Sequence, residues 1–113
     1  MFVGLVGSTA LSAQLDPEDM QPTITLYQNV VVGEITRFDG HVGKYMGDGV
    51  LCYFGWPYAH EDDAERAVKA GLAIMQMLQG MRATNGHPLA ARAGIATGLV
   101  VVGDLVGEGA AQE

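Results

Sequence analysis

The centre of the chain carries the stretch Gly43-Lys44-Tyr45-Met46-Gly47-Asp48-Gly49-Val50-Leu51-Cys52-Tyr53-Phe54. Strand-forming residues flank Gly47-Asp48-Gly49, and glycines tolerate the positive φ angles that a tight hairpin turn needs. The pattern therefore predicts a β-hairpin over residues 41–46 and 50–54, with Asp48 at its tip. Two glycines beside a carboxylate leave room for a metal ion and a phosphate, and Lys44 can face the same cleft. The stretch suggests a nucleotide site.

A long helix is expected before the hairpin. Asp16 suits the N-cap position, Pro17 the first helical position, and the acids after it the first turn. Apolar residues then recur at three- and four-residue intervals up to Asp39-Gly40, which predicts an amphipathic helix. We expect Pro22 to delay the regular helix by a turn. The expected apolar face consists of Met20, Ile24, Tyr27, Val31, Ile35 and Phe38.

Shorter elements complete the chain. Residues 2–6 suit a buried strand, and Ser8 or Thr9 can cap a brief helix that ends near Leu15. Acids at 61–63 favour the start of another helix, with Asp62 and Arg66 as an i,i+4 pair. Residues 89–97 and 99–103 are expected strands. The predicted order is β-α-α-β-β-α-β-β, in one domain over residues 1–113. The expected buried stripe of the later helix is Ala64, Ala67, Val68, Gly71, Met75 and Leu78.

Composition narrows the class of protein. The chain has 113 residues, of which 49% are hydrophobic, so one compact domain is expected. Its formal charge of −7 argues against a nucleic-acid partner. Cys52 is the only cysteine, which favours a reducing cytosol, and no apolar run is long enough to span a bilayer. We therefore expect a cytoplasmic chain with no membrane span.

Each candidate site residue also has an ordinary structural explanation. The turn at residues 7–9 is either a phosphate-holding helix start or a plain strand–helix connection. Asp48 is either a metal ligand or a turn residue. Lys44 either contacts a ligand or is a solvated lysine on an edge strand. Arg92 either contacts a phosphate or faces solvent from an edge strand. The three histidines lack ligand spacing, which argues against zinc.

Four segments together resemble the class III nucleotidyl cyclases, the adenylate and guanylate cyclase catalytic domain in its bacterial form. These segments are residues 2–12, 43–49 with Phe54, 60–64 with Ala67, and 92–103. They occur in the family's order and at compatible spacings over essentially the whole chain. The resemblance implies a ferredoxin-like α+β domain that lacks its last strands. It also implies a homodimer, or a heterodimer with another cyclase domain, with the active site at the shared interface.

The resemblance further implies a role in cyclic-nucleotide signalling, in which ATP is converted to 3′,5′-cyclic AMP and pyrophosphate. Two metal ions, Mg²⁺ or Mn²⁺, assist this reaction in the family. Asp48 matches a metal-binding aspartate, and the backbone of Leu5 matches a metal contact. Lys44 matches the lysine that contacts the adenine ring, which favours ATP over GTP. The matching phosphate-binding residues are Val6, Gly7, Ser8, Thr9 and Arg92.

Two departures from the family pattern qualify this assignment. Gly4 occupies the position of the first metal-binding aspartate and offers no side-chain ligand. The chain also ends at Glu113, before the segment that carries the family's transition-state residues, so no catalytic residue is assigned within it. We therefore expect this chain to be weak or inactive as an enzyme. Alternatives are a catalytically silent dimerisation or regulatory module of cyclase ancestry, and an unrelated ferredoxin-like ligand- or RNA-binding module.

Overall fold

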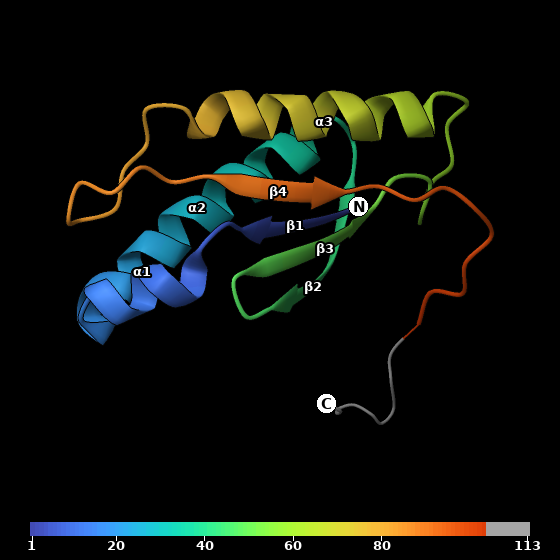
Figure 1. Ribbon diagram of the computed structural model, residues 1–113. Helices are drawn as coiled ribbons and strands as arrows, with labels where there is room; N and C mark the ends of the chain where they lie inside the picture. The colour runs from blue at the N-terminus through green and yellow to red at the C-terminus, as the bar shows by residue number, and fades with distance from the viewer. Residues whose placement is uncertain (104–113) are drawn as a thin grey trace.

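The computed structural model describes residues 1–103 of the chain. It confirms the expected α+β class, with an antiparallel sheet and three helices (Figure 1). The elements are, in order, β1 (Phe2–Leu5), α1 (Ser8–Gln14), α2 (Pro17–Arg37), β2 (His41–Met46), β3 (Gly49–Tyr53), α3 (Asp63–Leu78) and β4 (Ala91–Gly94).

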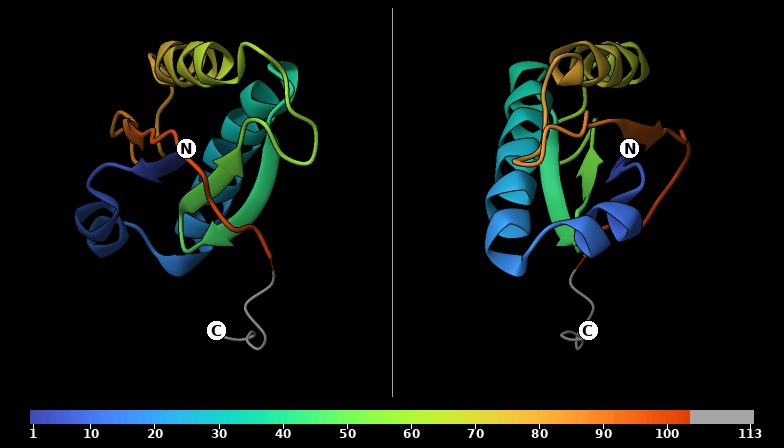
Figure 2. Two further views of the ribbon diagram at one scale, coloured as in Figure 1. Left: turned by 90° about the vertical axis from the view of Figure 1, so that its right-hand side faces the viewer. Right: turned by 60° about the vertical axis from the view of Figure 1, so that its left-hand side comes forward.

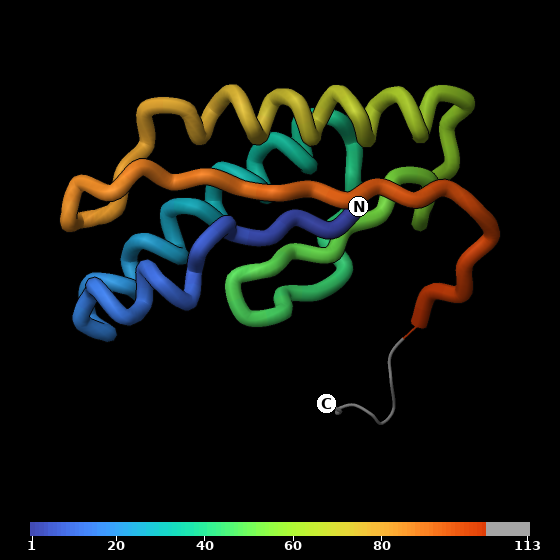
Figure 3. Tube along the Cα trace, viewed as in Figure 1, coloured from blue at the N-terminus to red at the C-terminus, as the bar shows by residue number. Residues whose placement is uncertain are grey.

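The sheet has the strand order β2-β3-β1-β4, and every neighbouring pair is antiparallel. The first strand of the chain, β1, therefore lies inside the sheet, between β3 and β4. Figure 2 shows α2 and α3 on the same side of the sheet. After β4 the chain runs past the N-terminus and turns away from α3 (Figure 3). Two chain segments that are far apart in sequence, β1 and β4, are thus direct neighbours.

The core lies between the sheet and the two long helices. Successive side chains of a strand point to opposite faces, so alternate residues of β1 and β3 enter this core. Phe2 and Leu51 lie on the opposite face, and 40% of the Phe2 surface is exposed. No helix of the described residues covers that opposite face, which we call the open face. The buried core residues from these four elements are Val3, Leu5, Tyr27, Val31, Ile35, Val50, Cys52, Ile74 and Leu78.

The hairpin forms where the sequence predicts it. Gly47 has φ 64°, in the left-handed region that a tight turn requires. The pairing register of β2 shifts between Val42 and Lys44, beside Gly43. A Cβ atom at Gly43 would lie 2.4 Å from a ring carbon of Tyr53, so this position admits only glycine without rearrangement. Beyond the shift, Lys44 pairs with Leu51.

The expected delay at Pro22 is wrong, because α2 begins at Pro17 and continues through Pro22. Asp16 occupies the N-cap position, although its side chain makes no capping hydrogen bond. Pro22 is the sixth residue of α2, so its missing amide leaves the Glu18 carbonyl without an intrahelical donor, and the helix nevertheless continues to Arg37. The next residue adds a local bond, since Thr23 Oγ1 donates to the Asp19 carbonyl at 2.9 Å.

The expected stripe of α3 is correct in part, since Ala67, Gly71 and Leu78 are buried. Ala64 and Val68 are exposed, and Ala70 and Ile74 are buried although the pattern did not include them. The side of α3 that carries Arg66 is turned inward, because its guanidinium bonds to the Phe38 carbonyl at the end of α2. The packing of α3 against α2 therefore decides which side chains of α3 are buried, and the apolar spacing predicted only part of that set.

The second expected strand pair does not form. Only Ala91–Gly94 is a strand, and it pairs with the four residues of β1. The ladder ends where β1 ends, since a strand cannot extend beyond its hydrogen-bonding partner. Residues 99–103, which were expected to form a strand, have no strand beside them among the described residues. Leu99 and Val101 are fully exposed there.

Within residues 1–103, no helix is both long and apolar enough to cross a membrane.

Candidate functional site

The tip of the β2–β3 hairpin contacts the end of β1. The amide of Leu5 donates to Asp48 Oδ1 across 3.4 Å. On the other side of the turn, Gln28 Nε2 of α2 donates to the Gly47 carbonyl at 3.2 Å. The sequence predicted a metal-binding carboxylate in the hairpin and a phosphate-binding turn after β1. The structure brings the carboxylate into contact with the end of β1, next to that turn. The contact with Gln28 had no counterpart in the sequence pattern, because it depends on how α2 packs against the hairpin.

Tyr27 is a second residue near this turn that sequence reasoning placed only in the core. Its side chain is fully buried, and its hydroxyl has no hydrogen-bond partner among the described residues. Burial raises the pKa of Tyr27 strongly, and the negative charge of Asp48 raises it further. Tyr27 is therefore electrostatically coupled to the carboxylate at the hairpin tip.

The turn after β1 connects that strand to α1, and one of its amides is bonded within the protein. Gly7 adopts φ 70° and precedes the first residue of α1. The Val6 amide donates to the Ala90 carbonyl at 2.8 Å, so this amide is used within the protein. Gly7, Ser8 and Thr9 follow directly in the turn and the first helical turn. Of the four predicted phosphate-contacting residues in this segment, Val6 is thus the one whose amide is already bonded.

Gly4, Arg92 and Lys44 lie on the open face of the sheet. Gly4 pairs directly with Arg92, and both neighbours of Gly4 in β1 are buried on the helix side. Lys44 pairs with Leu51, which itself pairs with Phe2 on the open face. Residues opposite each other in a ladder point to the same face. A cavity of about 430 Å³ lies over this part of the sheet, and Gly4, Val6, Gly7 and Arg92 line it.

The residues present do not fit the two-metal site that the resemblance implies. Among the described residues, no group of three or more His, Cys, Asp or Glu side chains is arranged so that it could hold a metal ion. Asp48 is the one carboxylate at the predicted position, and one of its oxygens accepts the Leu5 amide. Gly4 supplies no oxygen, although a Cβ atom there would meet only a Phe2 ring carbon at 3.6 Å. An acidic side chain at position 4 is therefore sterically possible but missing.

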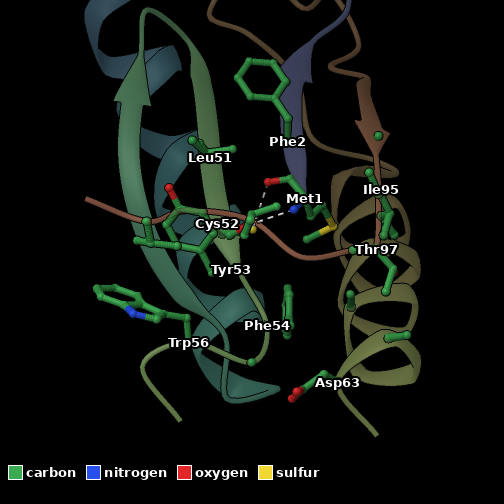
Figure 4. Close-up of a pocket in the computed structure, with 18 of the residues that line it drawn as sticks. Met1, Phe2, Leu51, Cys52, Tyr53, Phe54, Trp56, Asp63, Ile95 and Thr97 are labelled. Carbon is green, nitrogen blue, oxygen red and sulfur yellow. Dashed lines mark hydrogen bonds between the residues drawn. The ribbon is translucent and has the colours of Figure 1, made fainter. Parts of the chain in front are cut away.

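A larger cavity of about 760 Å³ lies beside β3, the start of α3 and the segment after β4 (Figure 4). Phe2, Tyr53, Trp56 and Ile95 contribute to its largely apolar lining, and Asp63 lies at its edge. The Met1 amino group donates to the Cys52 carbonyl at 2.8 Å at this position. None of the residues predicted for the nucleotide site lines this cavity. It adjoins the smaller cavity, because Phe2 and Gly94 line both.

Buried Arg66 organises the connection between α2 and α3. Its guanidinium bonds to Asp62 at 3.0 Å, to Asp63, to His60 Nδ1 at 2.9 Å and to the Phe38 carbonyl. The sequence predicted the pair with Asp62 alone. Asp63 lies on the same helix at i,i+3 spacing. His60 comes from the preceding loop and Phe38 from the end of α2, and spacing along one helix cannot indicate these two partners. None of these residues lines the cavity next to Gly4, whereas Asp63 lines the larger cavity.

Comparison with known proteins agrees with the resemblance to the nucleotidyl cyclases. Residues 1–112 match the Adenylate and Guanylate cyclase catalytic domain family. The chain is 32% identical over 106 residues to the uncharacterized protein Rv1318c of Mycobacterium tuberculosis, covering 93% of this chain and 19% of that protein. The chain thus spans about a fifth of the length of the curated relatives it matches.

Solved structures support the same fold. The adenylyl cyclase CyaB from P. aeruginosa has a TM-score of 0.70 and 27% identity, covering 80% of this chain and 50% of that one. The guanylyl cyclase Cya2 has a TM-score of 0.66 and 33% identity over 80% and 48% of the two chains. The guanylate cyclase domain of RhGC from Catenaria anguillulae, solved with GTP, has a TM-score of 0.75 and 24% identity over 80% and 50%. The chain belongs to the adenylate and guanylate cyclase catalytic domain family.

Proposed function

We propose that this chain is the nucleotide-binding part of a cyclase domain that acts on ATP, whose family reaction yields 3′,5′-cyclic AMP and pyrophosphate. The observation that carries the proposal is the position of Arg92 directly opposite Gly4, over a cavity that the Gly7 turn also lines. A cation beside a glycine-rich turn suits the phosphates of a nucleotide. Lys44 on the same face would contact the adenine ring.

The roles of the individual residues follow from this placement. Arg92 would bind the triphosphate with its planar guanidinium, which matches phosphate oxygens better than a lysine does. Gly7, Ser8 and Thr9 would contribute contacts from the turn, whereas the Val6 amide already bonds to Ala90. Asp48 would be a metal ligand, with the Leu5 backbone beside it. Mg²⁺ or Mn²⁺ would neutralise phosphate charge in a relative that has the full ligand set.

As it stands, this chain should be weak or inactive. Gly4 removes one of the hard oxygen ligands that the family uses to hold its metal ions. We place the protein in the cytoplasm, where ATP is abundant, as a homodimer or as a heterodimer with a more complete cyclase domain.

The test is to restore the missing acid in a protein that also contains the rest of the cyclase domain. Gly4→Asp should produce Mn²⁺-dependent cyclic AMP from ATP, measured by mass spectrometry, and should yield less cyclic GMP from GTP. Gly4→Asn is the matched control, because it has the same shape without the charge and should remain at background. A Gly4→Asp protein that dimerises and binds ATP but forms no cyclic AMP would contradict the proposal.

One observation favours a second candidate function, a silent dimerisation module. Several large apolar side chains are exposed in a chain whose Gly4 supplies no metal ligand. They include Tyr45, Met46, Leu99 and Val101. Exposed apolar patches of this kind mark interaction surfaces. Analytical ultracentrifugation with and without Mg-ATP tests this candidate. A chain that stays monomeric at high concentration, alone and mixed with an active cyclase domain, counts against it.

A further inference from the structure

Two cations on the open face are unusual in this acidic chain. Of the six Lys and Arg residues, four have partners within the described residues: Arg37 with Glu34, Arg66 with two aspartates, Lys69 with Glu65, and Arg82 with the Gly86 carbonyl. Lys44 and Arg92 form neither an ion pair nor a side-chain hydrogen bond within residues 1–103. The cations with no partner there are the two that the sequence assigned to the nucleotide site; Arg92 lines the 430 Å³ cavity, and Lys44 lies on the same face of the sheet outside its lining.

The side chains that line the 430 Å³ cavity carry a net positive charge. Arg92 is the charged side chain among the residues that line it, and Asp48 is not among them. An acid at position 4 would lie directly opposite Arg92 and would pair with it when no metal is present. With Gly4 there, Arg92 has no carboxylate opposite it in β1 and can pair with an incoming anion. Glycine at position 4 therefore removes two things at once: a ligand for a divalent cation and a carboxylate partner for Arg92.

We infer that the open face of this chain binds the polyphosphate of a nucleotide as the free anion, and that Mg²⁺ weakens this binding. The inference rests on the proposed nucleotide site. A bound Mg²⁺ neutralises part of the triphosphate charge and so reduces its attraction to Arg92 and Lys44. Where two carboxylates hold the ion, their contacts more than offset that reduction. Here Asp48 alone remains, outside the cavity and with one oxygen bonded to the Leu5 amide.

The sign of the Mg²⁺ effect is measurable by isothermal titration calorimetry on the whole chain. ATP is titrated once in EDTA and once in MgCl₂ at matched ionic strength, because salt also screens these charges. We expect tighter binding in EDTA. Gly4→Asp should reverse the sign, so that Mg²⁺ tightens binding, and Gly4→Asn should keep the original sign. The matched neutral variant separates the effect of the charge from that of the added side chain.

A second pair of variants tests the role of Arg92 directly. Arg92→Gln should weaken binding in EDTA by about tenfold or more, as expected for a lost charge-assisted hydrogen bond. Arg82→Gln is the matched control, because Arg82 is an arginine outside the cavity that bonds to the Gly86 carbonyl. It should leave ATP affinity unchanged in both buffers.

Inorganic triphosphate distinguishes failure of this inference from failure of the proposed function. Tighter binding of ATP than of triphosphate in EDTA, with both weakened by Mg²⁺, supports both. Equal binding of triphosphate and ATP in EDTA supports the anion site and counts against a nucleotide-specific function. ATP binding that requires Mg²⁺ overturns the inference and leaves the proposed function standing. Binding of neither probe in either buffer overturns both.

Discussion

The amide of Leu5 and the carboxylate of Asp48 are hydrogen-bonded across 43 positions of sequence, at 3.4 Å. This bond connects the hairpin tip to the end of the central strand. The same hairpin turn is bonded to α2 through Gln28 and Gly47. The geometry of the candidate site therefore depends on three elements that lie far apart along the chain.

The first prediction concerns this bond. Asp48→Ala should lower the free energy of unfolding by about 0.5–1 kcal/mol, because a long, partly exposed hydrogen bond contributes at the low end of the usual range. Asp48→Asn keeps an oxygen acceptor and should lose less. Urea denaturation followed by circular dichroism measures both. Equal destabilisation by the two substitutions would show that the carboxylate charge matters more than the acceptor.

The second prediction concerns the Tyr27 hydroxyl, which is fully buried and has no partner among the described residues. Tyr27→Phe should raise the free energy of unfolding by about 1 kcal/mol, because a desolvated polar group without a hydrogen bond destabilises the folded state. Tyr58→Phe is the control, since 78% of the Tyr58 surface is exposed, and it should have little effect. A clear loss of stability in Tyr27→Phe would mean that the hydroxyl is hydrogen-bonded in solution.

The third prediction concerns Arg66, whose side chain is 10% exposed and joins α3 to the end of α2. Arg66→Ala should destabilise the fold by about 2–3 kcal/mol, because it removes the donor to the Phe38 carbonyl and the cation that pairs with Asp62 and Asp63. Arg37→Ala removes a 61% exposed arginine paired with Glu34 and should change stability by about 0.5 kcal/mol or less. Similar losses in the two variants would contradict a structural role for the Arg66 network.

The fourth prediction concerns pH. Burial raises the pKa of Cys52 from its ordinary value of 9.0 to about 11, and the nearby Met1 amino group lowers it in part. The unfolded chain therefore releases this proton at lower pH than the folded chain does. The resulting stabilisation is complete below pH 9.0 and is lost as the pH rises toward about 11.

Urea denaturation at several pH values between these limits measures the effect. Tyr27 also ionises late because of burial, so the experiment uses Tyr27→Phe as the background. In that background Cys52→Val should flatten the pH dependence. A slope that is unchanged by Cys52→Val would assign the loss of stability to other groups.

Local patterns were sufficient for most of the elements. The glycines at 47 and 49 predicted the hairpin turn, and the three- and four-residue spacing predicted a helix that contains the buried residues Tyr27, Val31 and Ile35. The patterns failed where a segment needs a neighbouring strand in order to form a strand itself. Residues 99–103 have strand-forming side chains but no strand beside them within the described chain.

The sequence by itself determined the element types up to β4, which follow from periodicity and turn residues, both of them local. The resemblance of four segments to the cyclase family indicated the family and the acid missing at position 4. Only the tertiary structure decided that Gly4 lies opposite Arg92, that Asp48 bonds to Leu5, and that Arg66 rather than Val68 is turned inward. Register and burial depend on which distant segments pack together, and that choice depends on the free energy of the whole fold rather than of any one segment.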